Sequence, residues 1–196
     1  MQRALNEARQ LNNVRGMARA HRGLGTLAWR LDHDFAQAEM HWQTGIELAK
    51  TENNHCLLSM LYYNLASLYS RRGNLVEAET LFDAGLEEAR QHFSPVQLSI
   101  VLRGKGVLFA KRGDYLRAEA CFQEALAAMR PIGHQAEIVS SLTNLSIVAT
   151  HRGNYVQAAD YCREALHIAE KSNNRWMKAV VLENLGRLNQ KQGDWK

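Results

Sequence analysis

Three asparagines are the side chains in this sequence whose type and spacing first suggest chemistry. Asn64 precedes Asn144 by 80 residues, and Asn184 follows after another 40. A carboxamide carries N–H donors and an acceptor oxygen, so it can bond to the backbone of a bound peptide whatever the peptide's side chains are. The alternative is that each asparagine bonds to the backbone of a neighbouring part of the same chain.

Two columns of basic residues recur at the same spacing. They are Arg71, Lys111, His151 and Lys191, and beside them Arg72, Arg112 and Arg152. They could form a track for a polyanion, but cations in the last turn of a helix also complement its macrodipole, and we favour this structural interpretation. The net charge is only +4, and basic and acidic residues are interleaved, so a solvated surface without bound nucleic acid is expected.

No pattern typical of catalysis is present. The segments Gly23–Thr26 and Gly104–Gly106 are rich in glycine but lack the phosphate-binding arrangement GxxxxGK[ST], and the eight histidines form no HExxH motif. Asp32, His33 and Asp34 could be drawn as a metal site, but they fall where a turn is expected. We therefore predict a protein that is not an enzyme, without cofactor or metal.

The three cysteines form no CxxC pair and have no metal-ligand spacing. Cys121 and Cys162 fall at positions where a buried residue is expected, and Cys56 lies apart from them. Reduced thiols in the core of a cytoplasmic protein are the expectation. No apolar run is long enough to cross a membrane, and no signal peptide is recognisable, so no membrane partner is expected.

Glycines at 73, 113, 153 and 193, each followed by Asn or Asp, set a period of 40 residues. A fixed period of this length indicates stacked supersecondary units. We predict a single array over 1–196, with a partial unit at 1–13, units at about 14–54, 55–94, 95–134 and 135–174, and a partial unit at 175–196. Because the array starts and stops within a unit, we expect the chain to be a segment of a longer protein.

Each unit is predicted to be a helix pair. Leu61, Leu65 and Leu68 recur at helical spacing and make one apolar face of a first helix, and Gly73 then permits the positive φ of a helix end. Ser94 followed by Pro95 is typical of a helix start. His33 replaces the turn glycine in the most divergent unit.

The units resemble tetratricopeptide repeats, which read W-x2-L-G-x2-Y and then A-x3-F. Tyr62-x2-Leu65-Ala66-x2-Tyr69 with Ala78-x3-Phe82 fits closely, whereas in the next unit Lys105 replaces the leucine. The longer repeat is similar to those of kinesin light chains, the Leu-Gly-Asn scaffold proteins and bacterial LuxR-type and STAND-type regulators. The resemblance implies an all-α, right-handed solenoid of about five antiparallel helix pairs, incomplete at both ends.

In this family the first helices line a concave groove that receives a peptide or protein segment. Carried over by position, the groove residues are Tyr63, Asn64, Ser67, Arg103, Val107, Lys111, Thr143, Asn144, Ile147, Asn184 and Arg187, with Arg71, His151 and Lys191 one turn further along. Arg103 and Arg187 would favour a ligand with carboxylates. Glu183 argues against a uniformly positive groove.

The expected function is therefore protein–protein interaction through this groove. Two alternatives remain open: an effector-sensing segment of a bacterial transcription regulator, and a scaffold that forms homo-oligomers through its repeat ends. The sequence of the whole gene would separate the sensor from the binding module, because an ATPase or DNA-binding domain would accompany a sensor.

Overall fold

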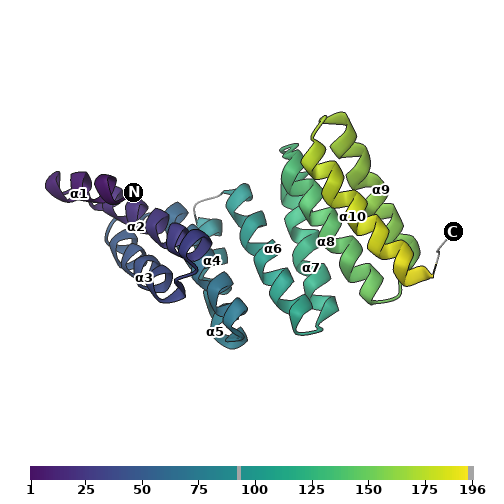
Figure 1. Cartoon of the computed structure of the whole chain (residues 1–196), viewed down its shortest axis with the longest axis horizontal. Coiled ribbons are helices and arrows are strands. Elements are labelled where there is room, and N and C mark those ends of the chain that lie inside the picture. Colours follow the sequence, from purple (N-terminus) through teal and green to yellow (C-terminus); the bar gives the residue numbers. More distant parts are fainter. Residues whose placement is uncertain (92–93, 194–196) are drawn as a thin grey trace. The chain divides into compact units, whose positions relative to one another are not determined.

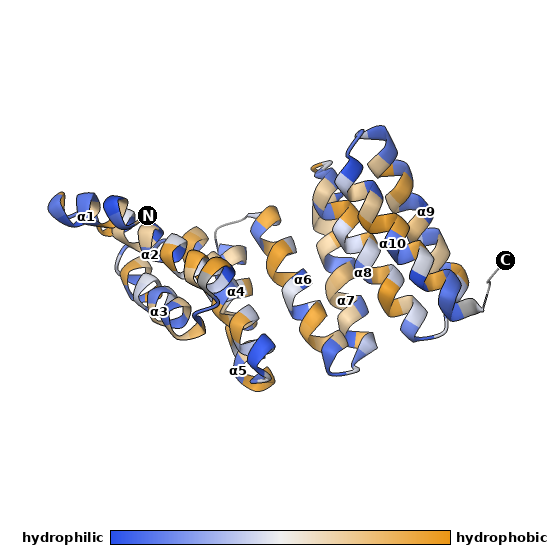
Figure 2. Cartoon of the chain, viewed as in Figure 1, coloured by the Kyte–Doolittle hydropathy of each residue, from blue (hydrophilic) through white to orange (hydrophobic). Residues whose placement is uncertain are grey.

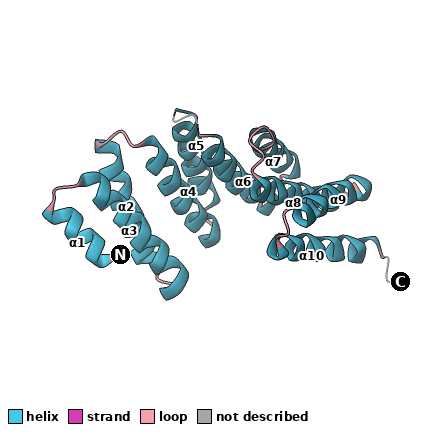
Figure 3. Ribbon diagram, turned by 90° about the horizontal axis from the view of Figure 1, so that it is seen from above, coloured by secondary structure: helices cyan, strands magenta, loops and turns pink. Residues whose placement is uncertain are grey.

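The computed structural model describes residues 1–91 and 94–193, in which we find ten α-helices, one short π-helix and no strand (Figure 1, Figure 3). They form two compact units, Met1–Gln97 and Leu98–Lys196. The helices are α1 (Gln2–Gln10), α2 (Val14–Leu27), η1 (Ala28–Asp32), α3 (Phe35–Thr51), α4 (His55–Arg72), α5 (Leu75–Gln91), α6 (Pro95–Lys111), α7 (Tyr115–Met129), α8 (Gln135–His151), α9 (Tyr155–Lys171) and α10 (Arg175–Gln192).

Consecutive helices pack as pairs within each unit. In the first unit α2 packs against α3 and α4 against α5, and in the second α8 packs against α9, with α10 against both. Helices of a pair run in opposite directions (Figure 1). The predicted all-α fold of helix pairs is confirmed. Within the described residues, no helix is both long and apolar enough to span a membrane.

The connections use the predicted turn residues. Gly73 ends α4 with φ of 89°, and Gly153 follows α8 with φ of 78°. Asp114 then caps α7 by accepting a hydrogen bond from the backbone N–H of Arg117. Ser94 does the same for α6, whose first residue is Pro95. Most of the last predicted turn, at residues 194–196, lies outside the described residues.

The repeat that comprises α2, η1 and α3 contains one residue more than the 40-residue period allows. The helix caps Asn13 and Asn54 are 41 residues apart, whereas Asn54, His134 and Asn174 follow multiples of 40. A π-helical turn has more residues per turn than an α-helix, so η1 absorbs the additional residue. The N–H of His33, which has φ of 53°, closes that turn on the carbonyl of Ala28.

The insertion changes which residues of α2 correspond to those of later units. Upstream of η1, equivalent positions lie 41 residues apart, so Gly25 corresponds to Ala66 and then to Gly106. The contacts agree, because an added Cβ on Gly25 would lie 2.6 Å from the ring of Trp42, and one on Gly106 would lie 2.6 Å from Phe122.

In the α2–α3 and α6–α7 pairs, a glycine on the first helix faces a large ring on the second helix. Trp42 and Phe122 are almost fully buried, and Cys162 occupies the same register in the next pair. There Ser146 replaces the glycine, and its hydroxyl lies 3.0 Å from the sulfur of Cys162. Most helices carry an apolar side and a polar side (Figure 2), and the polar side of the first helices is where the site was predicted.

Candidate functional site

The predicted groove residues of the second unit lie on α6, α8 and α10. Val107 on α6 is 50% exposed, Asn144 and Ile147 on α8 are half-buried, and Arg187 on α10 is exposed. A lone exposed valine is common on protein surfaces, but here it shares its face with the other predicted positions. We define this face of the first helices as the groove face.

A cleft of about 290 Å³ lies between α8 and α10 on the groove face. Ile147 and the buried Leu188 supply its apolar floor, and His151, Arg187 and Lys191 supply cationic or ionisable side chains around it. All of these residues come from first helices, one turn apart along each. The cleft can therefore take up an apolar side chain and place anionic groups against its rim.

Asn184 also lines this cleft, but it is only 7% exposed and bonds within the chain. Its amide nitrogen lies 3.4 Å from the carbonyl oxygen of Thr143 and 3.4 Å from the sulfur of Cys162. Burial raises the pKa of the Cys162 thiol, and the hydrogen bonds from Ser146 and Asn184 partly offset this. These bonds agree with the alternative considered for Asn184, a bond to a neighbouring repeat, and a ligand contact by Asn184 stays a prediction.

Thr143 is also buried, and its hydroxyl is used within its own helix. It is 9% exposed, and its hydroxyl donates to the backbone oxygen of Val139 at 2.8 Å. Asn64 and Asn144 differ from Asn184, because each is half-buried and neither carboxamide has a hydrogen-bond partner among the described residues. These two asparagines therefore keep their capacity to bind a ligand backbone.

The two arginines expected to attract a carboxylate already have one. The Nε of Arg103 donates to Glu137 of α8 at 2.9 Å, and the two side chains are only 23% and 15% exposed. Arg187 donates to Glu183 one turn earlier on α10 at 2.7 Å, where both are well exposed. Arg103 is thus a link between α6 and α8, and we no longer assign it to ligand selection.

In the first unit, Tyr63 and Ser67 on α4 are half-buried. The ring of Tyr63 packs at a tilt against Phe82 of α5, with centroids 6.1 Å apart. The hydroxyl of Ser67 donates to the backbone oxygen of Tyr63 at 2.8 Å. The ring of Tyr63 thus lies against α5, and Asn64 follows it on the same helix.

Most residues of the basic columns have structural partners. Arg72 pairs with Glu39 of α3 at 2.5 Å, and Arg152 pairs with Glu119 of α7 at the equivalent place in the second unit. Arg71 lies over the ring of Trp29, and His151 stacks on Tyr115. Lys111 and Arg112 also interact within the chain. These contacts support the structural interpretation over a polyanion track.

The sequence-based prediction missed the groove face of α2. With the 41-residue correspondence upstream of η1, Arg22 occupies the position of Tyr63 and Arg103. Arg19 likewise corresponds to Met60, and Arg15 to Cys56. The 41-residue spacing of the two helix caps, Asn13 and Asn54, could have revealed this correspondence from the sequence.

Two family models, each described as a tetratricopeptide repeat, match residues 56–130 and 103–174. Together they span 56–174, more than half of the chain. The chain belongs to the tetratricopeptide repeat family. This confirms the resemblance predicted from the motifs and supports a role as a protein–protein interaction module. Among curated proteins, no significant match to this repeat chain is found.

Solved structures show the same fold. BtubC (BKLC) from P. vanneervenii is similar with 22% identity and a TM-score of 0.85, over 99% of this chain and 82% of that one. A STAND protein with a tetratricopeptide repeat sensor from Pyrococcus horikoshii has 19% identity and a TM-score of 0.73, over 95% of this chain but 28% of its own. A putative kinesin light chain from Podospora anserina has 12% identity and a TM-score of 0.66, over 95% and 88%.

Proposed function

We propose that this repeat chain binds a peptide or protein segment of a partner on the groove face of its first helices. The α8–α10 cleft carries the proposal, because it joins an apolar floor to a cationic rim using residues of the groove register. An apolar side chain of the ligand enters beside Ile147 and Leu188. Carboxylates or backbone carbonyls of the ligand lie against Arg187 and Lys191.

The asparagines supply contacts that do not depend on the ligand's sequence. Asn144 is one turn from Ile147 on α8, and its carboxamide has no partner among the described residues. A bound backbone can accept from its N–H groups and donate to its oxygen. Asn64 offers the same contact on α4 of the first unit.

The test uses random peptides of about 12 residues, a length that suits groove recognition, displayed on phage and selected on the whole chain. Two variants are then compared with wild type: Ile147→Asp, which puts a charge in the cleft, and Asn64→Ala combined with Asn144→Ala. We expect selected peptides to bind each variant at least about tenfold more weakly, since loss of a hot-spot contact costs about 2 kcal/mol or more and a tenfold change corresponds to about 1.4 kcal/mol.

The matched control is Val156→Asp on α9, because Val156 is 80% exposed and lies on a second helix. It should bind the selected peptides as wild type does, and all variants should keep their helical circular dichroism. Equal binding by Ile147→Asp and Val156→Asp would contradict the proposal.

A second candidate function is effector sensing. It is favoured by the similarity to a STAND protein whose tetratricopeptide repeats are described as a sensor. In that case the α8–α10 cleft would hold a small anionic molecule, and a nucleotide-binding or DNA-binding domain would be encoded in the same gene. A gene that encodes no such domain would argue against this function.

A further inference from the structure

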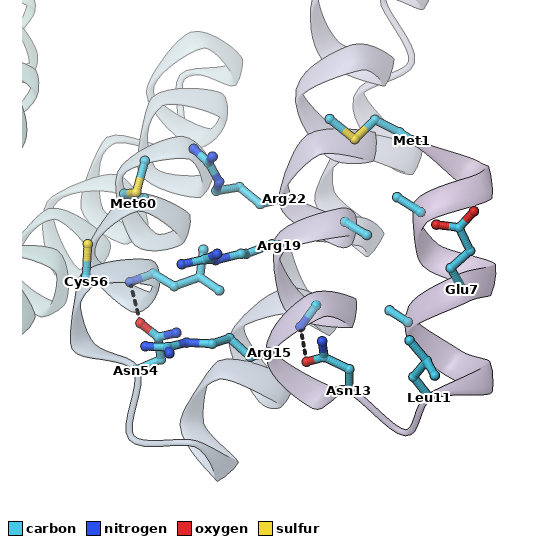
Figure 4. A pocket seen from close by; sticks show the side chains of 15 residues that line it. Met1, Glu7, Leu11, Asn13, Arg15, Arg19, Arg22, Asn54, Cys56 and Met60 are labelled. Carbon is cyan, nitrogen blue, oxygen red and sulfur yellow. Dashed lines mark hydrogen bonds between the residues drawn. The ribbon is translucent and has the colours of Figure 1, made fainter.

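A hollow of about 820 Å³ lies on the first unit, where α2 packs against both α1 and α4. Figure 4 shows Arg15, Arg19 and Arg22 extending from α2 toward α4, with Cys56 and Met60 on the opposite side. One side of the hollow is positively charged, because the three guanidinium groups lie on one face of α2. All residues that line the hollow belong to the first unit, so the hollow is separate from the α8–α10 cleft of the second unit.

None of these three arginines has an ion-pair or hydrogen-bond partner for its side chain among the described residues. The Nε of Arg22 is buried and still lacks one. By contrast, Arg72, Arg103, Arg130 and Arg152 each pair with a glutamate of another helix.

The surrounding helices do not provide the missing carboxylates. Neither α2 nor α4 contains an Asp or Glu. Among the described residues that line the hollow, Glu7 of α1 is the one acidic residue, and it accepts a hydrogen bond from Arg3 at 2.9 Å. The hollow thus concentrates positive charge that the described part of the chain leaves uncompensated.

The spacing fits a ligand with several anionic groups. Residues 15, 19 and 22 span about 10 Å along one face of an α-helix. Guanidinium groups bind carboxylates through paired N–H donors, and such charge-assisted bonds are stronger than neutral ones. A ligand that supplies these acceptors would also complete the hydrogen bonding around Arg22, whose buried group otherwise costs stability.

The rest of the lining decides between kinds of anion. Met1, Leu11, Leu57 and Met60 give the hollow apolar walls, and methionine adapts readily to different apolar side chains. None of the described residues that line it is aromatic, so they provide no platform on which nucleic-acid bases would stack. We propose that this hollow binds an acidic protein segment that carries apolar side chains between its carboxylates.

The charge is particular to α2. At the positions equivalent to Arg15 and Arg19, α4 has Cys56 and Met60, and α8 has Ala136 and Ser140. The proposed site lies on the groove face but in the other unit from the α8–α10 cleft. Either site can therefore fail its test without the other.

The experiment selects random displayed peptides of about 12 residues on the wild-type chain, with counter-selection on Arg15→Glu combined with Arg19→Glu. Peptides kept by wild type and lost by the variant should be rich in Asp and Glu with apolar residues between. A synthetic peptide from this set should bind the variant at least about tenfold more weakly, and so should bind wild type after its glutamates are changed to glutamine. Retained peptides without acidic enrichment would overturn the proposal, as would efficient competition by a single-stranded oligothymidylate.

Three further variants sharpen the result. Arg30→Glu with Arg175→Glu makes the same charge change on exposed arginines outside the hollow, and Ile147→Asp alters the other cleft. Both should bind the acidic peptide as wild type does. Arg22→Leu should bind it at least about fivefold more weakly while its Tm stays the same or rises, because an unpartnered buried group is removed. Unchanged binding by Arg22→Leu would remove Arg22 from the site.

Discussion

His21 of α2 and His41 of α3 meet inside the first unit. Their Nδ1 atoms lie 3.1 Å apart and their ring centroids 5.2 Å apart. At this distance one nitrogen donates and the other accepts, so the contact requires that the rings are not both protonated. Burial lowers the pKa of both histidines, and for His21 the neighbouring His41 and Arg9 lower the pKa further.

This pair predicts that acid destabilises the first unit. Because the pKa values are lower in the folded state than the ordinary 6.5, the unfolded chain takes up protons first as the pH falls. The stability that the neutral pair contributes is complete above about pH 6.5 and is lost as the pH falls toward the folded pKa values. The Tm, followed by tryptophan fluorescence, to which Trp29 and Trp42 of this unit contribute, should therefore drop between about pH 7.5 and 5.5.

His41→Gln should reduce this drop, because glutamine keeps a hydrogen-bonding group but does not titrate. His167→Gln, on the exposed surface of α9, is the control and should behave as wild type. The hypothesis is wrong if His41→Gln loses as many degrees on acidification as the wild-type chain does.

At the scale of elements, close approach of paired helices depends on a small residue at one register, and in α6 this residue is a glycine. An added Cβ on Gly106 of α6 would lie 2.6 Å from the ring of Phe122 on α7, whereas one on Gly186 of α10 meets nothing within 4 Å. The two glycines are equivalent by the period. The same substitution should therefore have opposite effects at the two sites.

We predict that Gly106→Ala lowers the free energy of unfolding by about 1–3 kcal/mol, because the buried ring has little room to move. Gly186→Ala should raise it by up to about 1 kcal/mol, since alanine favours the helix and no contact opposes it. Urea denaturation followed by circular dichroism measures both. Loss of stability in both variants, to a similar extent, would show that the contact with Phe122 is not the cause.

The π-helical turn η1 shows how an insertion is tolerated in a repeat. If a regular α-helix contained the additional residue, the residues of α2 would be rotated by about 100° relative to the turn at His33, because an α-helix has 3.6 residues per turn. Gly25 would then leave the ring of Trp42. The widened turn keeps the core contacts in place, and it thereby also keeps Arg15, Arg19 and Arg22 on the groove face.

At the scale of the molecule, the repeat period predicted the helix pairs and their turns, and the motifs within the repeats pointed to the family. The groove residues that can bind a ligand were harder to predict, because side chains from other helices already bond to some of them. Asn184 and Asn144 share a register, yet only Asn184 lies within reach of Thr143 and Cys162. Likewise, the position of Arg103 in the sequence gives no sign that Glu137 neutralises it.

The arginines of α2 were missed for a different reason. Counting by 40 from the turn residues places His33 correctly but misplaces every position upstream of η1 by one. The spacing of Asn13 and Asn54 records the insertion, so this part of the groove was in principle readable from the sequence. Only the structure could show that these arginines lack hydrogen-bond and ion-pair partners within the described part of the chain.

The two proposed binding surfaces differ in physical character, and this gives a prediction for the whole chain. Binding at the α2 hollow depends on three unpaired charges, whereas the α8–α10 cleft has an apolar floor, and Arg187 on its rim is already paired with Glu183. Salt screens exposed charges, with a Debye length of about 10 Å at 0.1 M and about 3 Å at 1 M, but does not weaken apolar burial.

We therefore expect the Kd of a peptide lost on Arg15→Glu with Arg19→Glu to rise at least about tenfold between 0.1 M and 1 M NaCl. The Kd of a peptide lost on Ile147→Asp should change by less than about threefold, because its main contact is apolar. Fluorescence anisotropy with the same wild-type sample measures both. The Val156→Asp chain serves as the control for nonspecific effects of salt, and equal salt dependence of the two peptides would contradict the assignment of charge recognition to α2.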